Sequence, residues 1–567
     1  MSTESRRIYQ KFALVPDSQF VLVMIAFAIG MAVRLVSLGA TLFTGNEVSL
    51  AYQALQVSRH LAVSSSAVPA YTGLTSLLFF LFEPSGLAAR LLPVVVGASL
   101  VVIPWFWKDR LGTRASLILS FALALDPTFV VFSRAINGGS LALAGILWGL
   151  TFLRTKKPAL AGIAVGMGFL GGVNFWNYLV LIAIIQLVAR LIEPSFSLRE
   201  YFEMESKSVN WAAAAVAFVI TIALVSTSFL LDPAGLGGAG SGILGYFKQF
   251  SEPFEKPIYH SIYLIFAHSF LPMVLFLLGL IKARGTNTQS AYSILGISAA
   301  VSVGFSIIVS RSSFELLLFP TLLFWVGGAI WLGGFVFEES ERNLATIGNS
   351  LFIFALLIFI SHNLRRLAPL QVSSPQFVNF SLMIIAGIVL LVLSWWLVSF
   401  SLTKPKSSQV LLVTLLLFLA VLNLSSVFRG VKVDQAFRWN EYLGSQVLLP
   451  NQNIGQIQAE FALAGKSPAQ LGSYDIAELP EALGWYFSNF AIERNEETPS
   501  MVLTRSSEMP AAQVELRGMN VVLERSVNWF SNAPANYLRL LIGAKPQFVD
   551  QNAVLWVKTN LFTGANQ

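Results

Sequence analysis

The pair Asn46-Glu47 is the part of the sequence most capable of chemistry. It follows the first hydrophobic segment, so the sequence places it at the boundary between lipid and water. A carboxylate there could accept a proton from an incoming nucleophile or hold a charged substrate. Glu47 is therefore the candidate catalytic residue. The alternative is that Glu47 only caps the helix that follows, where the helix dipole favours a negative charge.

The composition predicts an integral membrane protein. Of the 567 residues, 55% are hydrophobic and 12% are charged, and the mean hydropathy is +0.68. No water-soluble protein of this size carries such a balance. The net charge of +7 says little about partners, because membrane proteins collect Lys and Arg in cytoplasmic loops. No nucleic-acid-binding module and no Walker A motif is present, so we exclude nucleic acid and an ATP-driven pump.

Apolar stretches of about 20 residues, the length that crosses a bilayer as a helix, recur up to residue 428. They predict about thirteen spans, at 20–38, 88–107, 115–132, 140–154, 158–175, 177–192, 209–231, 262–281, 290–310, 314–336, 347–362, 377–402 and 409–428. Basic residues near the ends of the spans place the N-terminus in the cytoplasm. We expect a cytoplasmic segment over 1–19 and a transmembrane domain over 20–428.

Two regions on the predicted outer side break the hydrophobic pattern. Residues 39–87 form a long outer loop, in which 47–59 and 72–82 have the spacing of helices lying in the membrane interface. Residues 429–567 are more polar, and we expect them to form a small extracytoplasmic α/β domain. Its predicted strands are 501–504, 514–523 and 553–558, with a helix around 535–541.

A succession of short motifs resembles one family. Residues 34–39 read Arg-Leu-Val-Ser-Leu-Gly, and Asn46-Glu47 stands where the family carries Asp-Glu. Residues 89–93 read Ala-Arg-Leu-Leu-Pro and open the second span. Residues 126–134, Asp-Pro-Thr-Phe-Val-Val-Phe-Ser-Arg, are similar to a Ser-Pro-x-x-x-x-Tyr-Ser-Arg segment of the family. In this order the motifs resemble the GT-C glycosyltransferases, near the protein mannosyltransferase and bacterial aminoarabinose transferase branch.

The resemblance implies an α-helical polytopic membrane protein that moves a sugar from a polyprenyl-phosphate donor to a glycan, lipid or protein acceptor, with no metal or cofactor. Glu47 would then accept the acceptor's proton. Arg90, Arg134 and Lys256 are candidates to hold the leaving phosphate. Asn46 and His260 complete the predicted substrate-binding set; the eight-residue spacing of His260 and His268 is not a pattern of metal ligands.

Two departures from the family pattern leave the activity open. Asn46 replaces the leading Asp, and Gly139 stands where relatives often carry a second Asp. Either Glu47 has taken over the chemistry, or the chain is a catalytically degenerate relative that serves as a binding or assembly subunit. A secondary transporter is a third possibility, which the lack of an internal repeat disfavours.

Three further patterns give local expectations. The Gly-rich stretch after Asp232 reads as a flexible outer loop that could cover the site. Arg311 and Glu315 lie one helical turn apart and are expected to form a structural ion pair. Small residues along the fifth span, Gly162 among them, let neighbouring helices approach closely.

Overall fold

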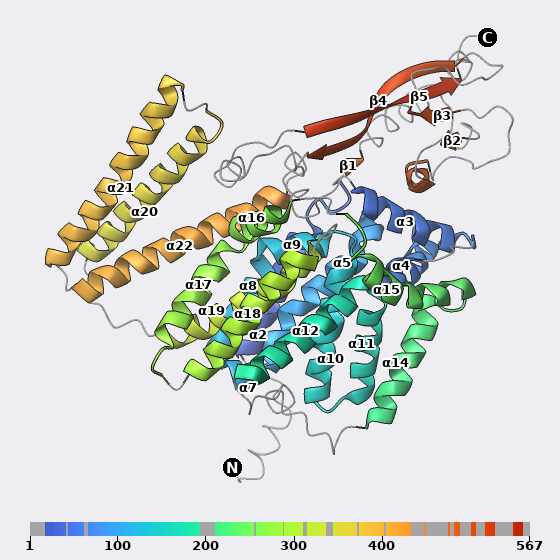
Figure 1. Cartoon of the computed structure of the whole chain (residues 1–567), viewed down its shortest axis with the longest axis horizontal. Coiled ribbons are helices and arrows are strands. Elements are labelled where there is room, and N and C mark those ends of the chain that lie inside the picture. The colour runs from blue at the N-terminus through green and yellow to red at the C-terminus, as the bar shows by residue number, and fades with distance from the viewer. Residues whose placement is uncertain are drawn as a thin grey trace, which may run out of the picture.

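A computed structural model shows a body of α-helices with a small β-sheet at one end (Figure 1). The structure describes residues 18–431 apart from 41–42, 62–65, 193–209, 254–256, 287, 310–313, 336–343, 371–372 and 402–403. Beyond residue 431 it describes 447–448, 474–476, 481–487, 501–505, 516–527 and 548–558. Lys256, Arg311 and the helix expected at 535–541 therefore lie outside the described residues.

Every predicted span overlaps a helix or a bent pair of helices. The helices of the first half are α2 (Ser18–Leu35), α3 (Gly45–Ser58), α4 (Pro69–Leu81), α5 (Gly86–Ser99), η1 (Leu100–Val102), α6 (Ile103–Phe106), α7 (Lys108–Leu111), α8 (Thr113–Leu125), α9 (Pro127–Arg134), α10 (Gly138–Arg154), α11 (Pro158–Phe169), α12 (Val173–Ile192) and α14 (Trp211–Ser226). They are followed by η2 (Pro233–Gly235), α15 (Leu236–Lys248), α16 (Ile258–His268), α17 (Phe270–Lys282), α18 (Gln289–Val309), η3 (Glu315–Leu317), α19 (Leu318–Gly334), α20 (Leu344–Leu367), α21 (Pro375–Ser401) and α22 (Lys404–Val431).

The predicted number of thirteen membrane crossings is not confirmed. Among the described residues, seven helices are long and apolar enough to cross a membrane, or up to nine if each of two bent pairs is one crossing. The pair α8 and α9 bends by 51°, and the pair α16 and α17 bends by 80°. The first bend has a local cause, because Asp126 caps the N-terminus of α9 and Pro127 occupies its first turn.

A buried arginine stabilises the same bend. Arg34 of α2 is fully buried, and its guanidinium donates to the carbonyl oxygens of Leu123 and Ala124, each at 3.0 Å, where α8 ends. Its Nε donates to Ser133 Oγ at 2.7 Å. The last carbonyl groups of a helix have no partner within the helix, so a cation that binds them satisfies both charge and geometry. Arg34 thereby ties α2 to both arms of the bend.

Glycines allow α11 to pack closely between α10 and α14, as the sequence predicts. A Cβ atom on Gly162 would lie 2.1 Å from the carbonyl oxygen of Ala214 in α14. On the other side, a Cβ on Gly145 of α10 would lie 2.4 Å from the Cα of Gly168. Backbones this close leave no space for side chains, which is how helices associate in lipid.

The Gly-rich stretch after Asp232 is a helix, α15, so its prediction as a flexible loop is wrong. Gly238 packs against Ser66, and Gly242 packs against the backbone of Gly172, at closest distances of 3.3 and 3.2 Å from an ideal Cβ. These contacts with neighbouring segments outweigh the low helix propensity of glycine. α15 therefore covers the segments before α4 and α12 with a fixed surface.

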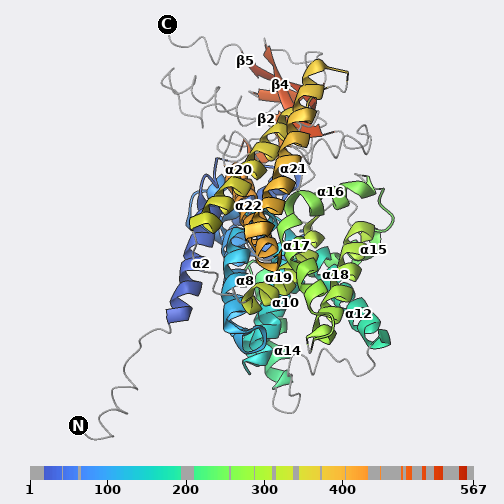
Figure 2. The same cartoon turned by 90° about the vertical axis from the view of Figure 1, so that its left-hand side faces the viewer.

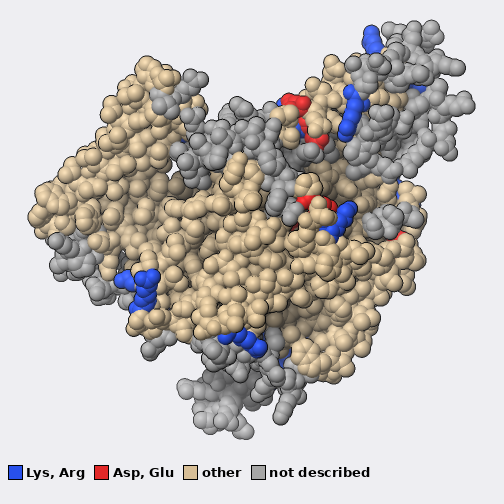
Figure 3. All heavy atoms as spheres, viewed as in Figure 1, with Lys and Arg blue, Asp and Glu red and all other residues tan. Residues whose placement is uncertain are grey.

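Helices α20 and α21 form a hairpin that stands apart from the other helices, and α22 returns beneath it to the body (Figures 1 and 2). Large apolar side chains of the hairpin are exposed, for example Leu382 and Phe400. In Figure 3, charged side chains gather near the lower edge of the body and near the sheet, with an uncharged belt between them. Such a belt suits the hydrocarbon of a bilayer.

The sheet has the order β1-β4-β5-β3-β2 and is antiparallel except for β2 beside β3. Its strands are β1 (Val447–Leu448), β2 (Tyr474–Ile476), β3 (Met501–Thr504), β4 (Leu516–Val527) and β5 (Phe548–Lys558). The three strands predicted from the sequence are confirmed, with β4 shifted and β5 extended. α2 starts toward the end of the body away from the sheet (Figure 2).

The sheet shares one hydrophobic core with helices α3 and α4. The short helix η6 (Glu481–Trp485) contributes to the core that the sheet shares with these two helices. The Trp485 ring contacts Phe43 and Phe79 at centroid distances of 5.7 and 5.6 Å. A Cβ on Gly484 would lie 2.8 Å from the Tyr52 ring, so glycine permits this close approach. The end of the helical body that carries α3, α4 and the N-termini of α10 and α12 is called the sheet-facing end below.

Replacing Gly162 with alanine tests the close packing of α11. We expect Gly162→Ala to lower stability by about 1–3 kcal/mol, because the added methyl group overlaps the backbone of α14. The measurement is thermal unfolding of the detergent-solubilised protein. The matched control is Gly304→Ala in α18, where a Cβ would have no neighbour within 4 Å and alanine favours the helix by up to about 1 kcal/mol. Equal melting temperatures for the two variants would contradict the packing.

Candidate active site

Helix α3 begins with a capping box that turns Glu47 inward. Thr44 Oγ1 accepts a hydrogen bond from the Glu47 backbone N–H at 3.3 Å, and the Thr44 N–H donates to Glu47 Oε2 at 2.9 Å. The Thr-x-x-Glu spacing encodes this reciprocal pair. Asn46, one residue earlier, is exposed. The two residues predicted as one functional pair therefore have opposite environments.

The structure brings Glu47 and Arg90 together in a buried ion pair. Arg90 Nε donates to Oε1 and Arg90 Nη2 donates to Oε2, both at 3.0 Å. The Ile136 backbone N–H also donates to Oε1, at 3.1 Å. Glu47 is 1% exposed and Arg90 is 3% exposed. With the Thr44 N–H, the carboxylate has four donor groups, which come from three residues, Thr44, Arg90 and Ile136.

These donors favour a structural role for Glu47. A bidentate guanidinium and two backbone N–H groups bind both oxygens of the buried carboxylate, so a substrate would have to displace one of them. The role of Glu47 as a proton acceptor stays a prediction. The capping role that the sequence offers as an alternative is present in the structure.

Aromatic rings connect the ion pair to the sheet. The Arg90 guanidinium lies over the Phe43 ring, 4.2 Å from its centroid, and Phe43 contacts Trp485 of η6. Next to Trp485, burial raises the pKa of the Tyr486 hydroxyl well above its ordinary value of 10, so Tyr486 stays neutral. Ion pair, ring and indole form one continuous contact from α5 to the C-terminal region.

The other predicted arginine, Arg134, holds the end of α2. Its Nη1 donates to the carbonyl oxygens of Val33, Arg34 and Val36 at 3.2, 2.8 and 2.7 Å, and the residue is 6% exposed. A cation at the C-terminus of a helix satisfies carbonyl groups that the helix leaves unpaired. The predicted phosphate-binding roles of Arg90 and Arg134 stay predictions, and the structure gives both side chains protein acceptors.

His260 lies buried in α16. Its ring meets the Phe314 ring edge to face, with centroids 4.9 Å apart. Phe314 immediately precedes Glu315, so His260, a predicted substrate-binding residue, lies next to the start of η3. Within the described residues, no group of three or more His, Cys, Asp or Glu side chains could hold a metal ion.

Glu315 is a partly exposed carboxylate at the sheet-facing end that the sequence reading assigned to an ion pair with Arg311. Its Oε2 accepts hydrogen bonds from the Gly139 N–H at the start of α10 and from Asn174 Nδ2 of α12, the latter at 2.6 Å. Only the fold brings residues 139, 174 and 315 together. The sequence signal that could have indicated this site is the position of Glu315, a charged residue directly before the apolar helix α19.

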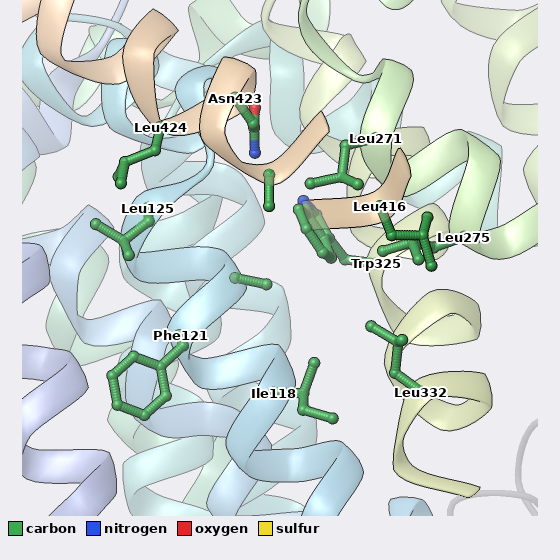
Figure 4. Close-up of a pocket in the computed structure, with 12 residues that line it drawn as sticks. Ile118, Phe121, Leu125, Leu271, Leu275, Trp325, Leu332, Leu416, Asn423 and Leu424 are labelled. Atoms are coloured by element: carbon green, nitrogen blue, oxygen red, sulfur yellow. The ribbon is translucent and has the colours of Figure 1, made fainter. Parts of the chain in front are cut away.

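A pocket of about 330 Å³ opens between helices α8, α17, α19 and α22 (Figure 4). Apart from Trp325 and Asn423, the side chains that line it are aliphatic or aromatic: Ile118, Phe121, Ala122, Leu125, Leu271, Leu275, Leu332, Leu416, Ala420 and Leu424. Trp325 Nε1 donates to Asp126 Oδ2 at 2.8 Å, which satisfies both polar groups. The pocket therefore suits an apolar ligand.

Comparison with solved structures gives near-full-length similarity. ArnT from Cupriavidus metallidurans bound to undecaprenyl phosphate matches 95% of this chain and 98% of its own, with 15% sequence identity and a TM-score of 0.53. The apo state of the same protein matches 96% of this chain and 99% of its own, with 15% identity and a TM-score of 0.52. No family model and no curated protein matches the sequence.

The fold is therefore a GT-C-like membrane fold with a small C-terminal sheet, which confirms the fold class predicted from the sequence. More particularly, it is similar to the fold of ArnT. At 15% identity the similarity establishes the fold only.

The Glu47–Arg90 pair can be tested by a double-mutant cycle. Removing one partner from a buried ion pair leaves an uncompensated group, so we expect Glu47→Gln and Arg90→Gln each to cost about 3–5 kcal/mol. The double variant should cost less than the sum, because neither charge is then left alone. Unfolding in detergent gives the three values.

The control for this cycle is Asp109→Asn. Asp109 lies 3.8 Å from the Arg154 guanidinium, and its side chain is 76% exposed. That change should cost no more than about 1 kcal/mol. Additive single effects at Glu47 and Arg90 would show that the two side chains are not coupled.

Proposed function

We propose that the protein is a membrane glycosyltransferase that moves a sugar from a polyprenyl-phosphate donor to a hydroxyl-bearing acceptor at the sheet-facing end. The observation that carries this proposal is the near-full-length similarity to ArnT, one structure of which holds undecaprenyl phosphate. The shared fold includes the outer helices and the sheet as well as the membrane helices, because the match covers 95% of the chain.

The distribution of polar groups supports the proposal. A polyprenyl tail needs apolar surroundings, whereas the sugar and its acceptor need polar ones. The body offers an uncharged belt and, at the sheet-facing end, carboxylates and arginines (Figure 3). The Arg134 guanidinium also lies there, and we propose that its positive charge attracts the phosphate of the donor.

The apolar pocket between α8, α17, α19 and α22 is proposed to hold part of the polyprenyl chain. Its volume of about 330 Å³ lies within the range of ligand pockets, and its lining is almost wholly apolar. Asp126, which accepts a hydrogen bond from Trp325 of the pocket wall, is fully buried. An isoprenoid can enter this pocket without stripping water from a charged group.

One pair of observations favours a second candidate, a catalytically degenerate relative that acts as a binding or assembly subunit. Asn46 cannot accept a proton at neutral pH, and the Glu47 carboxylate is bound by four donors. Such a subunit would still bind the lipid carrier while leaving sugars unchanged. Transfer itself is therefore the property to measure.

A glycan profile decides between the two candidates. Cells lacking the protein are complemented with the wild-type chain or with an empty vector, and cell-envelope glycans, lipids and proteins are compared by mass spectrometry. The glycosyltransferase predicts one sugar modification that is lost on deletion and restored by the wild-type chain. Unchanged profiles in both strains, at equal membrane protein levels, would contradict it.

Filling the apolar pocket tests the site of the lipid tail. We expect Ala420→Phe to weaken binding of undecaprenyl phosphate by about tenfold, which corresponds to about 1.4 kcal/mol. Binding is measured by titration of the purified protein in detergent. Leu417→Phe is the control, since Leu417 is an exposed residue of α22 that does not line the pocket. Equal affinities of the two variants would place the tail elsewhere.

A further inference from the structure

Two helices, α10 and α12, fix the position of Glu315. The Gly139 N–H at the start of α10 and Asn174 Nδ2 of α12 donate to its Oε2. The Tyr178 hydroxyl, also from α12, donates to the Glu315 carbonyl oxygen at 2.9 Å. Both the side chain and the backbone of Glu315 are therefore oriented.

Gly139 makes this arrangement possible. A Cβ atom on residue 139 would lie 2.5 Å from both the Cβ and the Oε2 of Glu315. Any other residue at this position would displace the carboxylate. The Glu315 carboxylate thus occupies the space that a side chain at position 139 would need, although the two residues are 176 positions apart in the sequence.

Glu315 and Glu47 bind the same short segment in different ways. Glu47 accepts the Ile136 N–H and Glu315 accepts the Gly139 N–H, three residues further on. Glu47 is 1% exposed and faces a bidentate guanidinium, whereas Glu315 is partly exposed. A proton acceptor must be oriented and yet reachable by substrate. Of these two carboxylates, Glu315 meets both conditions.

We propose that Glu315 is the catalytic proton acceptor at the sheet-facing end; this rests on the proposed function. The acceptor's hydroxyl oxygen attacks the anomeric carbon of the sugar and forms the new glycosidic bond. The bond between that carbon and the phosphate oxygen breaks, and its electron pair leaves with polyprenyl phosphate. The hydroxyl proton passes to the Glu315 carboxylate, which later releases it to water.

A purely structural role for Glu315, as a cap on α10, makes a different prediction. Glutamine keeps the size of the side chain and an oxygen that can accept from the Gly139 N–H, but it cannot take up a proton. A cap therefore tolerates Glu315→Gln, and a proton acceptor does not.

The test uses membranes from the complemented deletion strain, which hold the cell's own donor and acceptor. The initial rate of sugar transfer is followed by mass spectrometry from pH 5 to pH 9. We expect Glu315→Gln to lower the rate by about 10²–10⁴-fold, the usual contribution of general base catalysis. Glu315→Asp keeps an acid with shorter reach and should restore part of the rate, with a shifted acidic limb in the pH profile.

The control is Glu83→Gln, an exposed carboxylate after α4, which should retain the wild-type rate. A rate for Glu315→Gln within twofold of wild type would overturn the proposal and leave the cap as its role. If Glu315→Gln reduces protein levels, a pH profile of Glu315→Asp identical to wild type would overturn it equally. Absence of transfer by wild-type membranes would instead count against the proposed function.

Discussion

The ion pair between Glu47 and Arg90 is the interaction on which the sheet-facing end depends. It joins the first turn of α3 to α5, binds the Ile136 N–H before α10, and continues through Phe43 to the indole of Trp485. Two buried charges are favourable only when paired and fully hydrogen-bonded, and here both carboxylate oxygens have two donors. Helix α3, helix α5 and the C-terminal region are positioned relative to one another through this pair.

A second set of buried charges holds the membrane helices at the same end. Arg34 and Arg134 bind carbonyl oxygens at the ends of α8 and α2, and Asp126 caps α9 and accepts from Trp325. Each of these charged side chains binds a backbone N–H or C=O group that a helix end leaves without a partner. The motifs that resemble the GT-C family at residues 34–39, 89–93 and 126–134 all contribute to this framework, so their order in the sequence reflects the fold at least as directly as the chemistry.

Much of the fold could be predicted from the sequence because it follows from local patterns. Apolar length located the helices, the Thr44-x-x-Glu47 spacing encodes the cap, and residues 501–504 were predicted and found as a strand. The number of crossings could not be confirmed, since the length and composition of a bent pair such as α16 and α17 do not show whether the pair crosses the membrane once. The environment of Glu315 could not be predicted from the sequence either, because its contact with Gly139 joins residues far apart in the chain.

The central claim is that the Glu47–Arg90 pair is structural and that the sugar binds beside it, next to Glu315. The most direct measurement is a cryo-electron microscopy structure of the protein in nanodiscs with a polyprenyl-phosphonate sugar that cannot be cleaved. The account predicts the sugar at the sheet-facing end, within hydrogen-bonding reach of the Glu315 carboxylate, while Glu47 remains bound to Arg90. A sugar bound directly by Glu47, released from Arg90, would contradict it.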